Sequence, residues 1–269
     1  MRSRSADGTE GVFARERRQQ IMEIVDATGR ARVTQLAERF GVSPVTIRKD
    51  LVLLMGQQRL IRTHGGAIGS GTARPEVGFD VRERLQREEK LAMGEAAAAL
   101  IGDGESIALD ASTTALYVAR SLKNRATWYA LTVVTNSIRS ALELAGHPGI
   151  TVVMLGGRVR WEALSVVGPL GDGVFRKVNI QKAFMGCVGL TVESGVTDAT
   201  EEEAHIKRLM AASARQVYCV ADHTKWGKVG SATSCRTDRL SGVLTDMQAP
   251  TEMVTALREM GVEVRQVGA

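Results

Sequence analysis

A hydroxyl-rich loop in the second half of the chain has residue types that suit anion binding. The apolar run SIAL (106–109) is followed at once by Asp110, Ser112, Thr113 and Thr114, and then by the amphipathic segment ALYVARSL. Hydroxyl donors, free backbone N–H groups and the helix dipole at such a helix start can all point at one phosphate. Helix capping would also explain one or two of these residues, so the loop alone leaves both interpretations open.

Polar side chains also follow other apolar runs along the chain. Acidic residues such as Glu201 favour the positive end of a helix dipole, which is a purely structural explanation for them. Lys225 stands just after YCVAD, where its charge favours contact with an anion, although an ordinary surface lysine has the same pattern. The residues of this second group are Asn136, Gly157, Arg160, Asp198, Glu201, Lys207 and Lys225.

The runs that precede these residues predict a sheet that brings them together. They are short, apolar and rich in β-branched residues, and amphipathic segments separate them, which is typical of a mainly parallel α/β sheet covered on both faces. Ligands of such sheets bind at the carboxyl ends of the strands. The predicted strands are ESIALD, LTVVT, ITVVMLGG, KAFMGCVGL, QVYCVAD, SGVLTD and VEVRQV.

The stretch VTQLAERFGVSPVTIRKDLVLLMGQQRLIRTHGG (33–66) has a different pattern. Thr34 is a predicted N-cap, Gly41 a helix stop, and Ser43 followed by Pro44 a new helix start. Two short helices joined by such a turn match the helix-turn-helix, whose second helix enters the major groove of DNA. The alternative is an ordinary three-helix subdomain with a charged surface.

The second of these helices is predicted to separate a buried face from a DNA-facing one. Periodicity places one group of apolar residues inward and leaves polar residues for DNA, and two further residues before the Gly65-Gly66 turn suit a wing that touches phosphate or the minor groove. The predicted inward residues are Val45, Ile47, Leu51 and Leu54. The predicted DNA-binding residues are Ser43, Thr46, Arg48, Lys49, Arg62 and His64.

Charge is distributed unevenly along the 269 residues. The net charge of +5 comes from the first 70 residues, which hold 12 Lys and Arg against 7 Asp and Glu, because the rest is balanced at 23 against 23. A basic small domain is what a binder of the DNA backbone needs. Three cysteines without metal-like spacing are predicted to be reduced core thiols. Without a long apolar run or a signal-peptide core, the sequence predicts a cytoplasmic protein with no membrane contact.

Composition and pattern predict two domains joined by a linker. A first helix is expected in ARERRQQIMEIVDATG, after disordered residues 1–12, and an alanine-rich helix in REEKLAMGEAAAALI. The expected divisions are a winged helix-turn-helix domain at 13–68, with the helix-turn-helix itself at 33–52, a linker at 69–82 and a ligand-binding domain at 83–269.

Both halves resemble one protein family. F-x-V-S-x-x-T-I-R-K-D-L followed by I-R-T-H-G-G is similar to the N-terminal domain of DeoR-type bacterial repressors, which control genes of sugar and nucleoside catabolism. The segments LDASTT, VVTNS, LGGRVR, SVVGP, GVTDATEEEAHIKR and ADHTKWG, in this order, resemble the effector domain of the same family. The resemblance implies a C-terminal fold similar to ribose-5-phosphate isomerase and glucosamine-6-phosphate deaminase, and it extends from about residue 13 to the end.

The resemblance also implies roles for individual residues. Ser112, Thr113, Thr114 and Lys225 would hold a phosphate. The sugar would be surrounded by Asp110, Asn136, Gly157, Arg160, Asp198, Glu201 and Lys207. Three positions depart from the family pattern: Gln58 and Ser112 stand where relatives usually have glycine, and Val188 where they often have a polar residue.

The sequence thus predicts a DNA-binding transcription regulator, a repressor, that is controlled by a phosphorylated sugar and needs no cofactor. Its expected partners are a double-stranded DNA operator, the sugar phosphate and further copies of itself as a homodimer or homotetramer, since helix-turn-helix proteins read two half-sites. The alternative is an isomerase-like enzyme with an accessory DNA-binding domain, in which Asp110, Asp198, Glu201 or Lys207 would transfer a proton. A third, weaker alternative is a nucleic-acid-binding protein without any effector.

Overall fold

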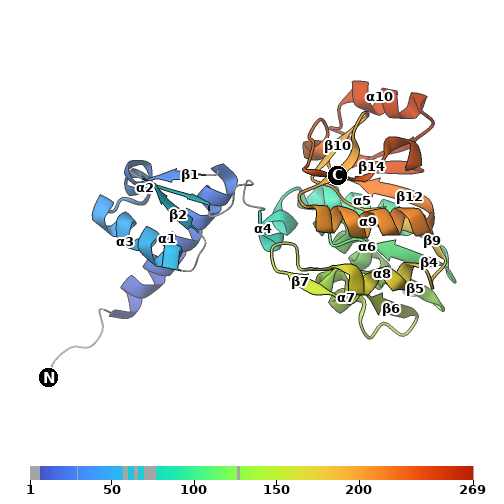
Figure 1. Cartoon of the computed structure of the whole chain (residues 1–269), viewed down its shortest axis with the longest axis horizontal. Coiled ribbons are helices and arrows are strands. Elements are labelled where there is room, and N and C mark those ends of the chain that lie inside the picture. The colour runs from blue at the N-terminus through green and yellow to red at the C-terminus, as the bar shows by residue number, and fades with distance from the viewer. Residues whose placement is uncertain are drawn as a thin grey trace. The chain divides into compact units, whose positions relative to one another are not determined.

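The chain divides into two compact units, Met1–Val77 and Gly78–Ala269 (Figure 1). The computed structural model describes residues 7–28, 30–56, 60–63, 66–69, 77–125 and 128–268. For residues 7–13, 15, 26–28, 30, 55, 56, 60–63 and 66–69 it describes the backbone alone. Each unit is considered by itself.

The first unit is a winged helix. Helices α1 (Asp7–Thr28), α2 (Val33–Phe40) and α3 (Pro44–Gly56) accompany a small antiparallel sheet in the order β1-β3-β2. Its strands are β1 (Arg30–Arg32), β2 (Leu60–Thr63) and β3 (Gly66–Gly69). The core includes Ile21 and Val25 of α1, Leu36 of α2, and Ile47, Leu51 and Leu54 of α3, as the apolar periodicity predicts.

Three local predictions for this unit are wrong. Helix α1 begins at Asp7, so residues 7–12 are helical instead of disordered. Helix α2 begins one residue before the predicted N-cap Thr34, and no side chain caps it. Val45 is 57% exposed, because two residues of α-helix turn by about 200° and therefore place it opposite the buried Ile47.

The second unit is built on a seven-stranded, entirely parallel sheet in the order β15-β14-β12-β9-β4-β5-β6. All seven predicted strands are present, and the expected mainly parallel sheet is confirmed. The strands are β4 (Ser106–Leu109), β5 (Leu131–Thr135), β6 (Ile150–Met154), β9 (Ile180–Met185), β12 (Ala214–Val220), β14 (Gly242–Asp246) and β15 (Glu263–Val267).

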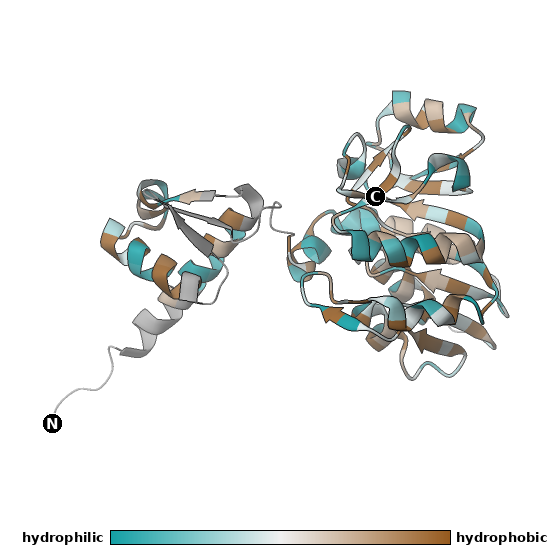
Figure 2. Cartoon of the chain, in the orientation of Figure 1, coloured by the Kyte–Doolittle hydropathy of each residue, from teal (hydrophilic) through white to brown (hydrophobic). Residues whose placement is uncertain are grey.

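Helices cover both faces of this sheet, whose apolar strands Figure 2 shows between them. One apolar cluster joins the sheet to α5, α6 and α7, and the other joins it to α9 and α10. Neighbouring residues Ile107 and Ala108 belong to different clusters because alternate side chains of a strand point to opposite faces. The helices are α5 (Arg87–Ala99), α6 (Thr113–Asn124), α7 (Ile138–Leu144), α8 (Asp172–Phe175), α9 (Glu201–Ser213) and α10 (Thr251–Glu259).

Several shorter elements were not predicted because their three- or four-residue strands carry too little periodicity. Strands β10 (Gly189–Thr191), β11 (Gly195–Asp198) and β13 (Ala232–Cys235) form an antiparallel sheet, and β7 (Arg158–Arg160) pairs with β8 (Ser165–Val167). Helix α4 (Phe79–Arg84) belongs to the second unit, and the predicted linker at 69–82 covers its first four residues. Short 3-10 turns occur at η1 (Pro169–Gly171), η2 (His223–Lys225) and η3 (Thr237–Arg239).

None of the helices in the described ranges has the length and apolar character needed to cross a bilayer.

Candidate functional site

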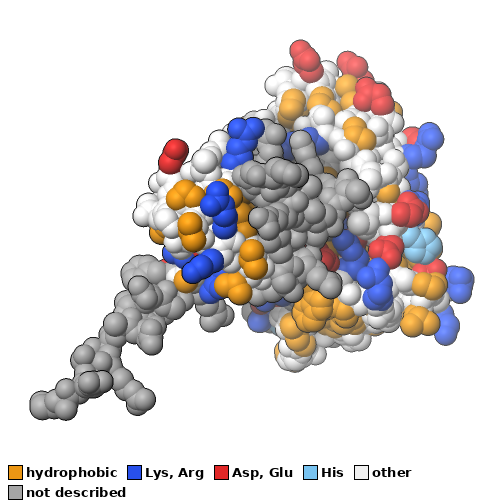
Figure 3. Space-filling model, turned by 60° about the vertical axis from the view of Figure 1, so that its left-hand side comes forward, with side chains coloured by type: hydrophobic (Ala, Val, Ile, Leu, Met, Phe, Trp, Pro, Cys, Tyr) orange, Lys and Arg blue, Asp and Glu red, His pale blue; other side chains and the backbone are white. Residues whose placement is uncertain are grey.

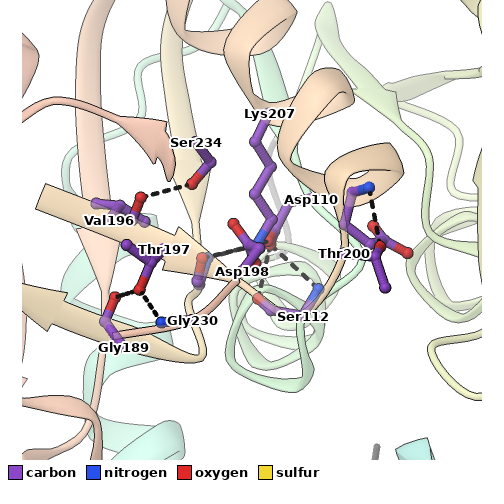
Figure 4. Close-up of polar contacts among 12 residues, drawn as sticks. Asp110, Ser112, Gly189, Val196, Thr197, Asp198, Thr200, Lys207, Gly230 and Ser234 are labelled. Carbon is purple, nitrogen blue, oxygen red and sulfur yellow. Dashed lines mark hydrogen bonds and ion pairs between the residues drawn. The ribbon is translucent and has the colours of Figure 1, made fainter. Parts of the chain in front are cut away.

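A buried lysine between two carboxylates lies at the carboxyl edge of the parallel sheet (Figure 4). The Nζ atom of Lys207, on α9, is 2.9 Å from Oδ2 of Asp110 and also forms an ion pair with Oδ1 of Asp198. It further donates to the carbonyl oxygen of Gly186 at 2.8 Å. All three charged side chains are no more than 6% exposed. The structure therefore joins three predicted site residues that are up to 97 positions apart.

The charges of this cluster explain its protonation. Burial alone would lower the pKa of Lys207, but the negative charges of Asp110 and Asp198 outweigh it and raise the pKa, so the ammonium stays charged. Burial raises the pKa of Asp198, against the opposing charge of Lys207. One ammonium between two carboxylates leaves excess negative charge in a buried place, which favours a ligand with hydrogen-bond donors.

The loop after β4 is organised by Asp110. Its Oδ1 accepts from the backbone N–H and the hydroxyl of Ser112 at 3.2 and 2.6 Å, and its Oδ2 accepts from the N–H of Gly186 at 3.1 Å. The Ser112 oxygen in turn caps α6 by accepting from the N–H of Ala115 at 3.1 Å. Ser112 therefore has the role that the helix-capping interpretation predicts, and its hydroxyl hydrogen is directed to Asp110. Thr113 and Thr114, which the phosphate interpretation also uses, form the first turn of α6.

Gly186 explains why these loops approach so closely. A Cβ atom at this position would lie 2.4 Å from the side chain of Ser112. Any larger residue would therefore separate the end of β9 from the loop after β4.

Two further predicted residues lie at the ends of β5 and β6, against β8. Nδ2 of Asn136 donates to the carbonyl of Val166 at 3.3 Å, while its Oδ1 is buried and has no hydrogen-bond partner among the described residues. Gly157 has φ +149°, and a Cβ there would lie 2.3 Å from the carbonyl oxygen of Val167. Gly157 thus permits β8 to approach closely, whereas the Oδ1 atom of Asn136 stays available to accept a hydrogen bond.

Arg160 meets a residue that the sequence did not single out. Its guanidinium donates to Oε1 of Glu203 at 2.7 Å, and the same oxygen accepts from the hydroxyl of Ser165. Glu203 is 6% exposed, whereas the predicted Glu201 has a side chain that is 71% exposed and paired with Arg208. Helical spacing could have indicated Glu203, because residues 203 and 207 lie one turn apart and share the face of the buried Ile206 and Met210. The site role of Glu201 stays a prediction.

Lys225 lies in the turn η2 after β12, at the same edge of the sheet. The structure records no hydrogen bond or ion pair of its ammonium with any described residue. The turn itself is fixed by Asp222, whose Oδ1 accepts from the N–H of Thr224 at 3.0 Å, and by Asp246, which accepts from the N–H and ring of His223. This hydrogen-bonded turn thus presents a lysine that forms no ion pair with the described residues.

The helix-turn-helix presents its charged residues to solvent. Ser43 caps α3 by accepting from the N–H of Thr46 at 3.1 Å, and the two hydroxyls are 2.9 Å apart. Arg48 and Lys49 are exposed and have no partner among the described residues, whereas the buried Asp50 binds Arg17 of α1 at 2.7 Å. Figure 3 shows several exposed Lys and Arg side chains among hydrophobic ones on the visible face of this unit.

The wing residues are described only in part. Arg62 lies in strand β2, and its side chain is not described. His64 and Gln58 lie outside the described residues. The DNA contacts expected of Arg62 and His64 stay predictions.

Comparison with known proteins assigns both units. Residues 17–70 match the DeoR-like helix-turn-helix domain, and residues 85–247 match the DeoR C terminal sensor domain. The chain is 35% identical over 252 residues to the uncharacterized HTH-type transcriptional regulator YulB of Bacillus subtilis (strain 168), covering 94% of this chain and 96% of YulB. It is 33% identical over 253 residues to the HTH-type transcriptional repressor GlcR of the same organism, covering 94% and 96%. Both similarities run through the two units.

Solved structures are more distant. Ribose 5-phosphate isomerase A from Neisseria gonorrhoeae matches 52% of this chain and 54% of its own, with 17% identity and a TM-score of 0.40. The full-length sorbitol operon regulator SorC from Klebsiella pneumoniae matches 94% and 100%, with 12% identity and a TM-score of 0.39.

Proposed function

Because the chain belongs to the DeoR family of helix-turn-helix transcriptional regulators, we propose that it represses genes of sugar catabolism under the control of a phosphorylated sugar. The helix-turn-helix unit binds operator DNA, and the sensor domain binds the sugar phosphate. A ligand that prefers one of two arrangements of the protein changes DNA affinity by its differential affinity, typically about 1–3 kcal/mol.

For DNA, we assign α3 to the major groove. Thr46, Arg48 and Lys49 lie in its N-terminal half, which is the part that reads base edges in helix-turn-helix proteins. Arg48 and Lys49 are exposed and have no partner in the described part of this unit, so they need no rearrangement before they meet DNA. Such proteins read two half-sites, so we further propose that the protein binds a repeated or palindromic operator as a homodimer or homotetramer.

For the ligand, the supporting observation is a complementary set of unsatisfied groups at one sheet edge. Oδ1 of Asn136 and Oδ2 of Asp198 are buried acceptors without a hydrogen-bond partner among the described residues. Buried polar atoms are normally paired, so these two suit the hydroxyl hydrogens of a sugar. Lys225 offers an unpaired ammonium for the phosphate, with Thr113 and Thr114 at the start of α6 as further donors.

Enzymatic turnover is the less favoured function. A base must give up its proton near neutral pH, yet Lys207 is held charged by Asp110 and Asp198. We therefore assign Lys207 to binding. Release of an isomerised sugar phosphate by the purified protein would contradict this assignment.

The test is fluorescence anisotropy of the full-length protein with DNA from upstream of its own gene, with scrambled DNA as control and a panel of pentose and hexose phosphates as ligands. We expect tight, salt-dependent binding to the upstream DNA that one sugar phosphate changes. In Lys225→Met, DNA binding should persist while the response to that ligand is lost. A full response of this variant at the wild-type ligand concentration would exclude Lys225 as the phosphate contact.

A further inference from the structure

Helix α3, the second helix of the helix-turn-helix, carries an apolar side chain on its outward side. Its buried face consists of Ile47, Leu51 and Leu54, which are at most 4% exposed. Because each residue of an α-helix turns by about 100°, Val45 and Lys49 lie about 150° and 170° from the middle of that face. Val45 is accordingly 57% exposed. The core of this unit therefore makes no use of Val45.

Neither capping nor helix propensity explains a valine at this position. The cap of α3 is formed by Ser43, whose hydroxyl accepts from the N–H of Thr46 at 3.1 Å and lies 2.9 Å from the Thr46 hydroxyl. Valine is also a weaker helix former than alanine, because its branched Cβ loses rotamer freedom in a helix. The structure thus leaves contact with another molecule as the role of this side chain.

The charges around Val45 indicate which molecule that is. Arg48 and Lys49 follow it within one turn and are exposed, and Figure 3 shows hydrophobic side chains among Lys and Arg side chains on the visible face of this unit. A second copy bound through the same face would bring like charges together, which opposes association. DNA supplies the opposite charge. The surroundings of Val45 therefore suit DNA better than a second protein surface.

The chemistry of the major groove narrows the contact to one base. Val45 is the second residue of α3, in the half of the helix that reads base edges in helix-turn-helix proteins. Of the four bases, thymine alone presents a methyl group in the major groove, and apolar side chains recognise that group. Cytosine presents an amino group there, which an isopropyl group would remove from water without offering an acceptor.

We propose that the isopropyl group of Val45 packs against the 5-methyl group of a thymine in each half-site of the operator. The proposal rests on the proposed function, because it takes α3 as the helix that enters the major groove. Burial of one such methyl group corresponds to about fourfold in affinity. Val45 is thus a specificity-determining residue, whereas Arg48 and Lys49 supply charge and hydrogen bonds.

The experiment removes the methyl group from the DNA. Fluorescence anisotropy compares full-length protein on its own upstream DNA with duplexes in which one thymine at a time is replaced by deoxyuridine, which pairs identically and lacks only the methyl. Wild type should bind about fourfold more weakly when the substitution falls on one particular thymine of either half-site. Val45→Ala should bind the thymine DNA more weakly than wild type does. At those positions it should bind thymine and uracil duplexes equally, because the two changes remove the same contact.

Val52→Ala is the matched control. Val52 lies two turns further along the same side of α3 and is 53% exposed, but it belongs to the C-terminal half of the helix. This variant should keep the preference of wild type for thymine over uracil. Neither variant should shift the thermal unfolding midpoint, because both side chains are exposed.

Three results would overturn the proposal. Equal affinity of wild type for thymine and uracil at every position would show that no methyl group is read. A preference that persists in Val45→Ala would assign the contact to another residue. If Val45→Ala instead weakened self-association in sedimentation and left the thymine preference intact, Val45 would belong to a protein interface.

The same titrations separate this inference from the proposed function. Wild type that binds scrambled DNA as tightly as its upstream DNA would refute the proposed function, and the reading of thymine with it. Specific binding to the upstream DNA that is insensitive to every methyl group would refute the role of Val45 alone.

Discussion

The two units handle charge in opposite ways. In the helix-turn-helix, Arg48 and Lys49 are exposed and pair with none of the described side chains, whereas in the sensor unit Lys207 is buried between Asp110 and Asp198. DNA is a large polyanion that reaches any exposed cation, so the DNA-binding unit needs no prearranged counter-charge. A small ligand must be selected by a fixed geometry, which buried and mutually paired groups supply at the cost of desolvation. Substitution of the exposed Arg48 or Lys49 should therefore affect function alone, whereas substitution of the buried Lys207 should affect folding as well.

The largest expected effect is in the sensor unit. Lys207→Met leaves two buried carboxylates without a counter-charge and should destabilise this unit by about 3–5 kcal/mol. The chain's three tryptophans, Trp128, Trp161 and Trp226, all lie in this unit, so urea unfolding followed by tryptophan fluorescence reports on it. Adding Asp198→Asn should recover part of the loss. A loss of stability below about 1 kcal/mol in Lys207→Met would contradict the difference proposed between the two units.

The corresponding change in the other unit should leave folding intact. Arg48→Ala should weaken operator binding by about 1–3 kcal/mol and relax its specificity, without a shift in the thermal unfolding midpoint. Anisotropy and calorimetry measure the two effects. Arg236→Ala, at an exposed arginine of the sensor unit paired with Asp238, is the control and should alter neither. If Arg48→Ala unfolded the protein, Arg48 would be a structural residue.

A smaller effect sharpens the comparison within α3 itself. Ser43→Ala removes the cap on the N–H of Thr46 and should cost about 1 kcal/mol of stability. DNA affinity should fall as well, because the same hydroxyls lie at the predicted DNA surface. Ser43→Asp keeps a cap and should restore stability but not affinity, since its charge repels phosphate. Equal recovery of both would place Ser43 outside the DNA interface.

The smallest predicted effect concerns pH. Folding lowers the pKa of Lys90 from 10.5 to about 8, so between these values the unfolded chain binds more protons and stability rises with pH. This contribution is complete above 10.5 and is lost as the pH falls to 8. Relative to Lys90→Met, wild type should gain about 1 kcal/mol between pH 7 and 9, as measured by urea unfolding. Parallel curves of unfolding free energy against pH for the two proteins would show that folding does not lower the pKa of Lys90.

Continuous apolar runs and the helical period of 3.6 residues were enough to predict most of the secondary structure. The seven strands were recognisable because each is an apolar run flanked by amphipathic segments, and Ser43-Pro44 marked the start of α3 correctly. Short strands such as β7 and β10 were missed because three residues do not establish a period. Helix α4 was missed because six residues after a glycine- and proline-rich stretch do not differ enough from a linker.

The sequence by itself determined where the strands lie along the chain, which polar residues follow them and that the first domain is basic. These features depend only on neighbours along the chain. Tertiary structure alone decided which of these residues meet. It selected Glu203 over Glu201 to face Arg160, because the phase of α9 is set by packing against the sheet. It also placed Lys90 beneath α4 and Lys207 between Asp110 and Asp198, since parallel strands bring distant residues to one edge only when the whole sheet is assembled.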